Sequence, residues 1–143
     1  MIRGPLTAVA HPRLYALAVR TAWRLRASRL DEVVAWTRNA VAFRRFGSYE
    51  AAPAAAVAVV CRMLTPASMP GGQRCLVRAL LLYGLLHRTI PGLRVWIGFR
   101  PGESGSPIDG HAWAADGDVP LSAADAEAPR VFSSRFELCG PAR

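Results

Sequence analysis

The hydrophobic positions of this chain follow a helical period through its first two thirds and a strand period beyond. Up to His87, apolar side chains recur at spacings of three and four residues, which indicates amphipathic helices. From Leu93 they alternate with polar positions, as half-buried strands require. The pattern predicts helices from Pro12 to about Leu25, from Asp31 until Gly47, from Ser48 and Pro53 to about Leu64, and from Cys75 to about His87. It predicts strands at 93–99, 108–115 and 119–122, with a hairpin turn at Asp116-Gly117-Asp118.

Turn residues divide the chain without cutting it into separate domains. The run at 65–72 is rich in Pro, Gly, Ser and Thr, so it ends the helical half. Beyond Ala123, only 131–132 and 136–138 suggest further order. Helices followed by a small antiparallel sheet define the α+β class. We therefore predict one domain over 1–143, with a helical part at 1–70, a core at 71–125 and a C-terminal tail at 126–143.

The composition is that of a globular protein with an uneven distribution of charge. The chain has 143 residues, of which 52% are hydrophobic, and arginines interrupt the helices before any apolar run reaches the roughly 18–20 residues of a membrane span. Residues 1–100 carry fifteen Arg against three acids, whereas residues 101–143 carry three Arg against seven acids. The basic half is either a set of solvated helix faces or a surface that attracts an acidic peptide or protein. No nucleic-acid-binding motif accompanies it, so we expect no nucleic-acid partner.

The cysteines and histidines suit neither a disulfide framework nor a zinc site. There are three of each, without a C-x-x-C pair and without ligand spacing. The first ten residues lack the apolar core of a signal peptide. We therefore expect a cytoplasmic protein that needs no metal and no organic cofactor.

The strongest chemical signal is a cysteine at the start of a helix. Gly71 and Gly72 break the backbone, and Cys75 then lies in the first turn of an apolar helix. Unpaired backbone N–H groups and the positive end of the helix dipole favour thiolate there, and the thiolate is the nucleophile. His111, flanked by Gly110 and Ala112, is the expected proton acceptor if the fold brings it to the thiol.

These motifs together resemble a known family. The segments QRCLVRALLLYGLLH, LRVWIGF and GHAWAADG are similar to the stand-alone leader peptidase of lasso-peptide biosynthesis, a transglutaminase-like cysteine protease. The resemblance implies a papain-like or transglutaminase-like core with catalytic residues at Cys75 and His111. It also implies cleavage of the leader peptide from a ribosomally made precursor. The implied partners are the precursor's leader, a small leader-recognition protein and an ATP-dependent macrolactam cyclase.

The third catalytic residue of that family, an Asp on the strand after the His strand, does not fall on a carboxylate here. A turn at Asp116-Gly117 places Ser122 opposite His111, and a turn at Gly117-Asp118 places Ala124 there. Asp125 is one step beyond and is the best candidate. Asp118 and Asp116 lie nearer the turn, and Ser122 or a backbone carbonyl are the alternatives to an acid.

Two further residues are candidates for supporting roles. Gln73 either donates to an oxyanion, as a Gln does in papain-like enzymes, or caps the helix. The backbone N–H of Cys75 is the simpler oxyanion donor. Arg78 lies about one turn after Cys75 and supports the thiolate, binds the substrate backbone or joins an ion pair.

Two rival functions remain open at this point. One is a transglutaminase-like amidase or acyltransferase that uses the same Cys–His pair. The other is a non-catalytic scaffold of the same fold, which the displaced acid motivates. The function we expect is that of a cysteine peptidase.

Overall fold

A computed structural model describes residues 11–65, 69, 73–102 and 108–141. The predicted Gly71-Gly72 break, most of the predicted loop at 100–107 and the first ten residues lie outside these ranges. The helices are α2 (Pro12–Ala27), α3 (Leu30–Asn39), α4 (Val41–Arg44), α5 (Gly47–Ala51), α6 (Pro53–Met63), α7 (Arg74–Leu86) and α8 (Ala128–Val131), with a 3-10 turn η1 (Ala123–Asp125). The strands are β1 (Leu93–Pro101), β2 (Ile108–Asp116), β3 (Val119–Pro120) and β4 (Ser134–Cys139).

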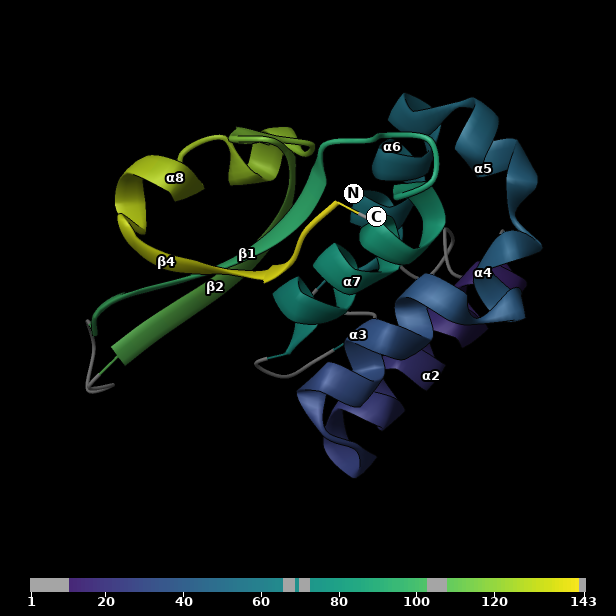
Figure 1. Cartoon of the computed structure of the whole chain (residues 1–143), viewed down its shortest axis with the longest axis horizontal. Helices are drawn as coiled ribbons and strands as arrows, with labels where there is room; N and C mark the ends of the chain where they lie inside the picture. Colours follow the sequence, from purple (N-terminus) through teal and green to yellow (C-terminus); the bar gives the residue numbers. More distant parts are fainter. Residues whose placement is uncertain (1–10, 66–68, 70–72, 103–107, 142–143) are drawn as a thin grey trace.

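Helix α7 is the centre of the molecule. It contacts α2, α3 and α6 on one side and strands β1 and β2 on the other, and Figure 1 shows it between the sheet and the remaining helices. From Ala79 to Leu86 all of its residues are buried, which explains the long apolar run in its sequence. The helical half packed on a small antiparallel sheet confirms the predicted α+β class. None of the described helices is long and apolar enough to cross a membrane.

The first helix forms where the pattern predicts it. Pro12 occupies its first turn, where the missing N–H costs no helical hydrogen bond. Leu14, Leu17 and Ala18 are buried at helical spacing, and the buried Thr21 hydroxyl donates to the Leu17 carbonyl. This face packs on α7 and leaves the opposite face of α2 to solvent.

The prediction of one helix from Asp31 until Gly47 was wrong. The backbone at Ala40 is extended, and Gly47 begins α5 instead of ending a helix. In a continuous helix Trp36 and Phe43 would lie about 10 Å apart along the axis. The break at Ala40 brings their rings into an edge-to-face contact at 5.0 Å, with Phe43 buried against α7.

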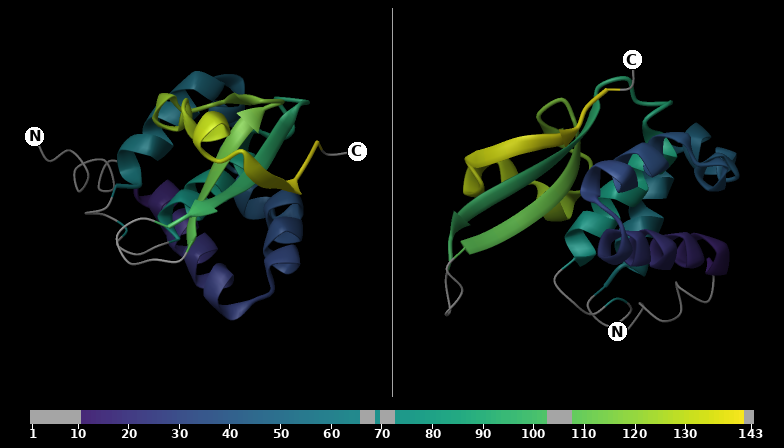
Figure 2. Two further views of the ribbon diagram at one scale, coloured as in Figure 1. Left: turned by 90° about the vertical axis from the view of Figure 1, so that its left-hand side faces the viewer. Right: turned by 60° about the horizontal axis from the view of Figure 1, so that its bottom comes forward.

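The sheet is antiparallel and has the order β3-β2-β1-β4. The β1–β2 pairing runs from Leu93↔Asp116 to Pro101↔Ile108, and Figure 2 shows this long hairpin extending past the helices. Strand β3 pairs only with Ala115 and Asp116. The predicted third strand at 119–122 is therefore longer than β3, although the Leu121 N–H still donates to the Ala114 carbonyl at 3.0 Å.

The two faces of the sheet bury different residues. Ala112 and Ala114 of β2 belong to the main core under α7, where their small side chains allow the helix to approach closely. Trp113 and Ala115 point to the other face, where Phe132 covers them. This alternation is the one expected for a strand covered on both sides.

The C-terminal segment is more ordered than a tail. Strand β4 pairs with β1 along the edge opposite β2. The Tyr83 hydroxyl of α7 donates to the Gly140 carbonyl at 2.7 Å and accepts from Arg38 Nε at 2.9 Å. The predicted tail at 126–143 thus contains an edge strand, whose weak sequence signal was confined to 136–138.

We expect Gly84→Ala to destabilise the fold by about 2 kcal/mol. A Cβ at Gly84 would overlap the ring of Phe43, which is 1% exposed and cannot move into solvent. The free energy of unfolding in urea measures the effect. Gly47→Ala is the matched control, because no atom lies within 4 Å of a Cβ there, and it should change stability by less than about 0.5 kcal/mol. Equal stabilities of the two variants would contradict this packing.

Candidate active site

Cys75 lies in the first turn of α7, at the boundary between the helix and the sheet. Gln73 precedes the helix in a non-helical conformation, and the helix begins at Arg74. The Cys75 thiol is half-buried and forms hydrogen bonds with the His111 side chain and the backbone of Ala112. The sulfur therefore lies beside His111 and Ala112 of β2, whereas β3 pairs with Ala115 and Asp116 of the same strand.

His111 projects from β2 on the face that Phe132 covers. Its Nε2 lies 2.8 Å from Oδ1 of Asp125, which leaves Nδ1 as the ring nitrogen available to the thiol. The ring stacks at 5.9 Å on Trp113 and at 5.6 Å on Phe132. These contacts limit rotation of the imidazole, so both of its nitrogens keep fixed partners.

Asp125 reaches His111 from a turn and not from a strand. After β3 ends, Ser122 Oγ accepts a hydrogen bond from the Ala124 N–H and starts η1. This turn buries Asp125, whose side chain is 3% exposed. The same Oδ1 that meets His111 also lies 2.7 Å from a terminal nitrogen of Arg78. One carboxylate oxygen thus joins the sheet to the central helix.

The electrostatics favour a charged Cys–His pair. The hydrogen bond to Asp125 and the one to Cys75 raise the pKa of His111 to about 9, although burial opposes the shift. Burial raises the pKa of the Cys75 thiol, but the His111 and Ala112 hydrogen bonds and the charges of His111 and Arg78 outweigh it. The net shift of the Cys75 pKa is downward. Both shifts therefore favour thiolate beside imidazolium more than in free cysteine and histidine.

The other predicted residues lie in different positions. Arg78 is an ion-pair member, with a side chain that is 13% exposed and bound to Asp125. Gln73 is exposed and its side chain makes no capping hydrogen bond. Asp118 is 81% exposed and faces Arg135, so it is not near His111. Ser122 accepts from Ala124 and from the Cys61 thiol and orders the turn that carries Asp125.

Sequence reasoning named Asp125 as the best candidate acid but not the turn that carries it, and it missed the role of Phe132. Phe132 gave only a weak hydrophobic signal, and nothing in the pattern indicated that it stacks on His111. The placement of Asp125 had a readable signal, because Ser122 followed by an acid three residues later is a helix-start motif. The prediction continued the strand past Pro120, so Ser122 and Asp125 were not recognised as the start of a helical turn.

The described residues contain no group of three His, Cys, Asp or Glu side chains that could hold a metal ion. The site instead offers a nucleophile, a base held in one orientation and a buried carboxylate. Such a set is suited to forming and breaking an acyl–sulfur bond. It also places the Cys75 N–H among the unpaired amides of the first helical turn, where an oxyanion could bind.

The fold and the site define an α+β protein with a Cys–His–Asp arrangement between a central helix and an antiparallel sheet. A sequence profile of the transglutaminase-like superfamily matches residues 16–133. Because this match covers most of the chain, the protein belongs to the transglutaminase-like superfamily. Comparisons with curated proteins and with solved structures gave no significant match.

Alkylation of Cys75 by iodoacetamide is expected to have its midpoint at lower pH than alkylation of free cysteine, because only thiolate reacts. Mass spectrometry of the intact and digested protein gives the rate at each pH. Cys139 serves as an internal reference, since it is buried and its pKa is raised to about 12. His111→Ala should move the Cys75 midpoint upward. An unchanged midpoint in that variant would mean that the imidazole does not stabilise the thiolate.

Proposed function

We propose that this protein is a cysteine peptidase that removes the leader peptide from a ribosomally made lasso-peptide precursor. The observation that carries the chemistry is the hydrogen-bonded series Cys75–His111–Asp125 at the helix–sheet boundary. The assignment to lasso-peptide maturation rests on the resemblance of the Cys75 and His111 segments to the leader peptidases. Catalysis in this proposal needs no metal and no organic cofactor.

In the first half of the reaction, Cys75 Sγ attacks the carbonyl carbon of the bond between leader and core. A C–S bond forms, and the carbonyl oxygen takes up negative charge, which the Cys75 N–H stabilises. The His111 imidazolium then gives its proton to the leaving nitrogen. The C–N bond breaks, the core peptide leaves with a free amine, and the leader stays as a thioester.

In the second half, neutral His111 takes a proton from water, and the resulting hydroxide attacks the thioester. The C–S bond breaks, and the leader leaves with a free carboxylate while Cys75 and His111 return to the charged pair. Asp125 keeps Nε2 of the imidazole hydrogen-bonded throughout, so Nδ1 continues to face the sulfur. Each proton thereby moves between groups that already lie side by side.

The proposed partners follow from the resemblance and from the small size of the protein. Most of a small chain is needed to build the fold, which leaves little surface to recognise a leader sequence. The β1–β2 hairpin and the C-terminal segment form the sheet, and the helical half covers one of its faces. We propose that a small leader-recognition protein delivers the precursor and that a macrolactam cyclase takes the released core. Cleavage by the reconstituted pair should therefore be faster than cleavage by this chain alone.

The test is incubation of the purified protein with a lasso-peptide precursor, with and without a leader-recognition protein. Mass spectrometry should find two free peptides whose masses sum to the precursor plus one water. A leader linked to an added amine, without gain of water, would support the acyltransferase instead. Equal rates with and without the recognition protein would contradict the proposed delivery. An intact precursor in both mixtures would contradict peptidase activity.

A further inference from the structure

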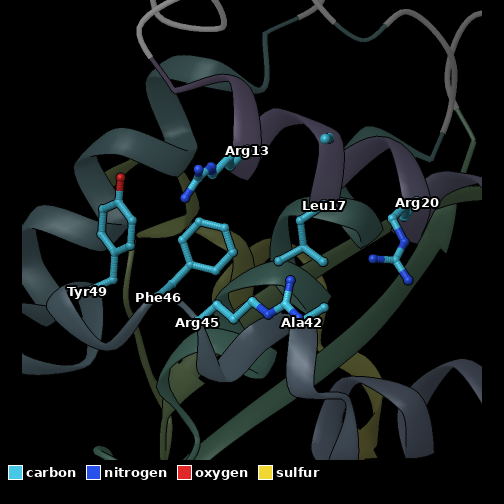
Figure 3. Close-up of a pocket in the computed structure, with 8 residues that line it drawn as sticks. Arg13, Leu17, Arg20, Ala42, Arg45, Phe46 and Tyr49 are labelled. Atoms are coloured by element: carbon cyan, nitrogen blue, oxygen red, sulfur yellow. The ribbon is translucent and has the colours of Figure 1, made fainter.

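The helical half contains an open groove separate from the Cys75 site. It has a volume of about 650 Å³ and lies between α2 and the α4–α5 segment. Figure 3 shows Leu17 and Phe46 in it, with the side chains of Arg13, Arg20 and Arg45 around them and Tyr49 at one end. None of the side chains that line it belongs to the Cys–His–Asp arrangement.

The groove combines an apolar floor with a cationic rim. Leu17 is buried and Phe46 is half-buried, so the floor is part of the packed core. Arg13, Arg20 and Arg45 are exposed. A carboxylate that entered here would meet guanidinium groups able to bind it with two parallel hydrogen bonds, beside apolar surface that lowers the effective dielectric.

The rim arginines are without a carboxylate partner in the described ranges. Other arginines of the chain are paired: Arg78 with Asp125, Arg88 with Glu50 and Arg94 with Glu137. For residues 11–65, 69, 73–102 and 108–141, no ion pair involves Arg13, Arg20 or Arg45. Arg20 lies over the Trp36 ring at 5.8 Å, a contact that leaves its N–H donors available to a ligand. Among the described residues, no carboxylate therefore pairs with the three arginines of the rim.

The spacing of the rim sets the form of the ligand. Arg13 and Arg20 are two helical turns apart on α2, a distance of about 10 Å. An extended peptide covers this distance in about three residues. Arg45 approaches from the opposite wall (Figure 3). Because side chains three residues apart in an extended peptide point to opposite sides, the matching ligand carries two acidic side chains at this spacing, one for the α2 wall and one for Arg45. Apolar side chains between them meet Leu17 and Phe46.

We propose that this groove binds an acidic, partly apolar stretch in the leader region of the peptide substrate. The inference rests on the proposed peptidase function for the source of the peptide, and on charge complementarity for its composition. Since the groove is lined by no residue of the Cys75 site, it contributes to substrate affinity and not to the chemical step. Its loss should raise KM and leave kcat unchanged.

The first test is direct binding to the full chain. The probe is a fluorescein-labelled peptide that contains Glu-Leu-Phe-Glu, and fluorescence anisotropy reports its affinity. The double variant Arg13→Glu/Arg45→Glu should bind at least about tenfold more weakly. The matched control is Arg26→Glu/Arg44→Glu, which makes the same change of net charge at exposed arginines outside the groove. Equal weakening by both double variants would overturn the proposal, because it would show attraction by net charge alone.

A second measurement needs no altered protein and so does not depend on the folding of a variant. The probe with Gln-Leu-Phe-Gln should bind the unaltered chain at least about tenfold more weakly than the acidic probe. Equal affinity would overturn the assignment of an acidic ligand.

The last measurement identifies the source of the peptide. Precursor whose leader glutamates and aspartates are replaced by their amides should show a higher KM and the same kcat. If KM is unchanged although the probe still binds in the groove, the peptide that the groove binds does not come from the substrate, and the proposal is overturned. Cleavage at saturating precursor concentration tests the peptidase function separately, because the rate then depends on kcat and not on the affinity that the groove contributes.

Discussion

Cys75→Ala is expected to lower the rate of leader release by at least roughly a thousandfold. The variant keeps His111, Asp125 and the helix amides, but no group remains that can form the acyl–sulfur bond. Because the thiol is half-buried, its removal should leave the fold intact. The rate is measured by mass spectrometry of precursor cleavage, and circular dichroism checks the fold.

The control for this variant is Cys61→Ala. Cys61 lies on α6 outside the Cys–His–Asp arrangement and contacts Ser122 at 3.4 Å. The Cys61→Ala variant should cleave the precursor at a rate within about twofold of that of the unaltered chain. If Cys75→Ala released the leader at the rate of the unaltered chain, Cys75 would not be the nucleophile, and the proposed peptidase mechanism would be wrong.

Asp125→Asn is expected to affect stability and catalysis together. It leaves the Arg78 guanidinium, which is 13% exposed, without its charge partner, at a cost of about 3 kcal/mol in the free energy of unfolding. It also removes the main cause of the raised pKa of His111, so that pKa should fall from about 9 toward its ordinary value. The leaving amine needs imidazolium as its acid, and imidazolium would then be lost at lower pH. The alkaline limb of the rate profile should shift to lower pH accordingly.

The matched control for that variant is Asp118→Asn, the same chemical change at a carboxylate that is 81% exposed. Its stability should change by less than about 0.5 kcal/mol, and its pH profile should match that of the unaltered chain. Urea unfolding and the pH dependence of kcat/KM give the two readouts. If the alkaline limb stayed in place in Asp125→Asn, the carboxylate would not govern the titration of His111.

The helix that carries Cys75 and the hairpin that carries His111 were predictable because both have strong local patterns. The run from Val77 to Leu86 is apolar on nearly every side, and 93–99 is rich in β-branched and aromatic residues and follows Pro91-Gly92. The position of Asp125 was harder to predict, since it depends on where β3 ends. Pro120 and Ser122 end the pairing and begin a turn, so counting along a strand could not give the position of its carboxylate.

Tertiary packing decided the elements that the sequence did not predict. The break at Ala40 has no Pro or Gly to indicate it, and the contact of Trp36 with Phe43 is made only in the folded chain. Strand β4 pairs with the edge of β1 opposite β2, a long-range contact that the weak local pattern at 136–138 could not give. Arg78 had three candidate roles from its position on the helix. The structure gives it the ion pair with Asp125, and its charge also helps to lower the pKa of Cys75.

The order in which the ribosome makes these residues has a consequence for the nascent chain. Cys75 is synthesised before β2 exists, and the carboxylate that orients His111 comes fifty residues after the thiol. Until β2 packs on α7, the Cys75 thiol lacks the His111 and Ala112 contacts that lower its pKa. Under the proposed mechanism, the Cys–His–Asp arrangement is therefore completed only when β2 and η1 have packed against α7.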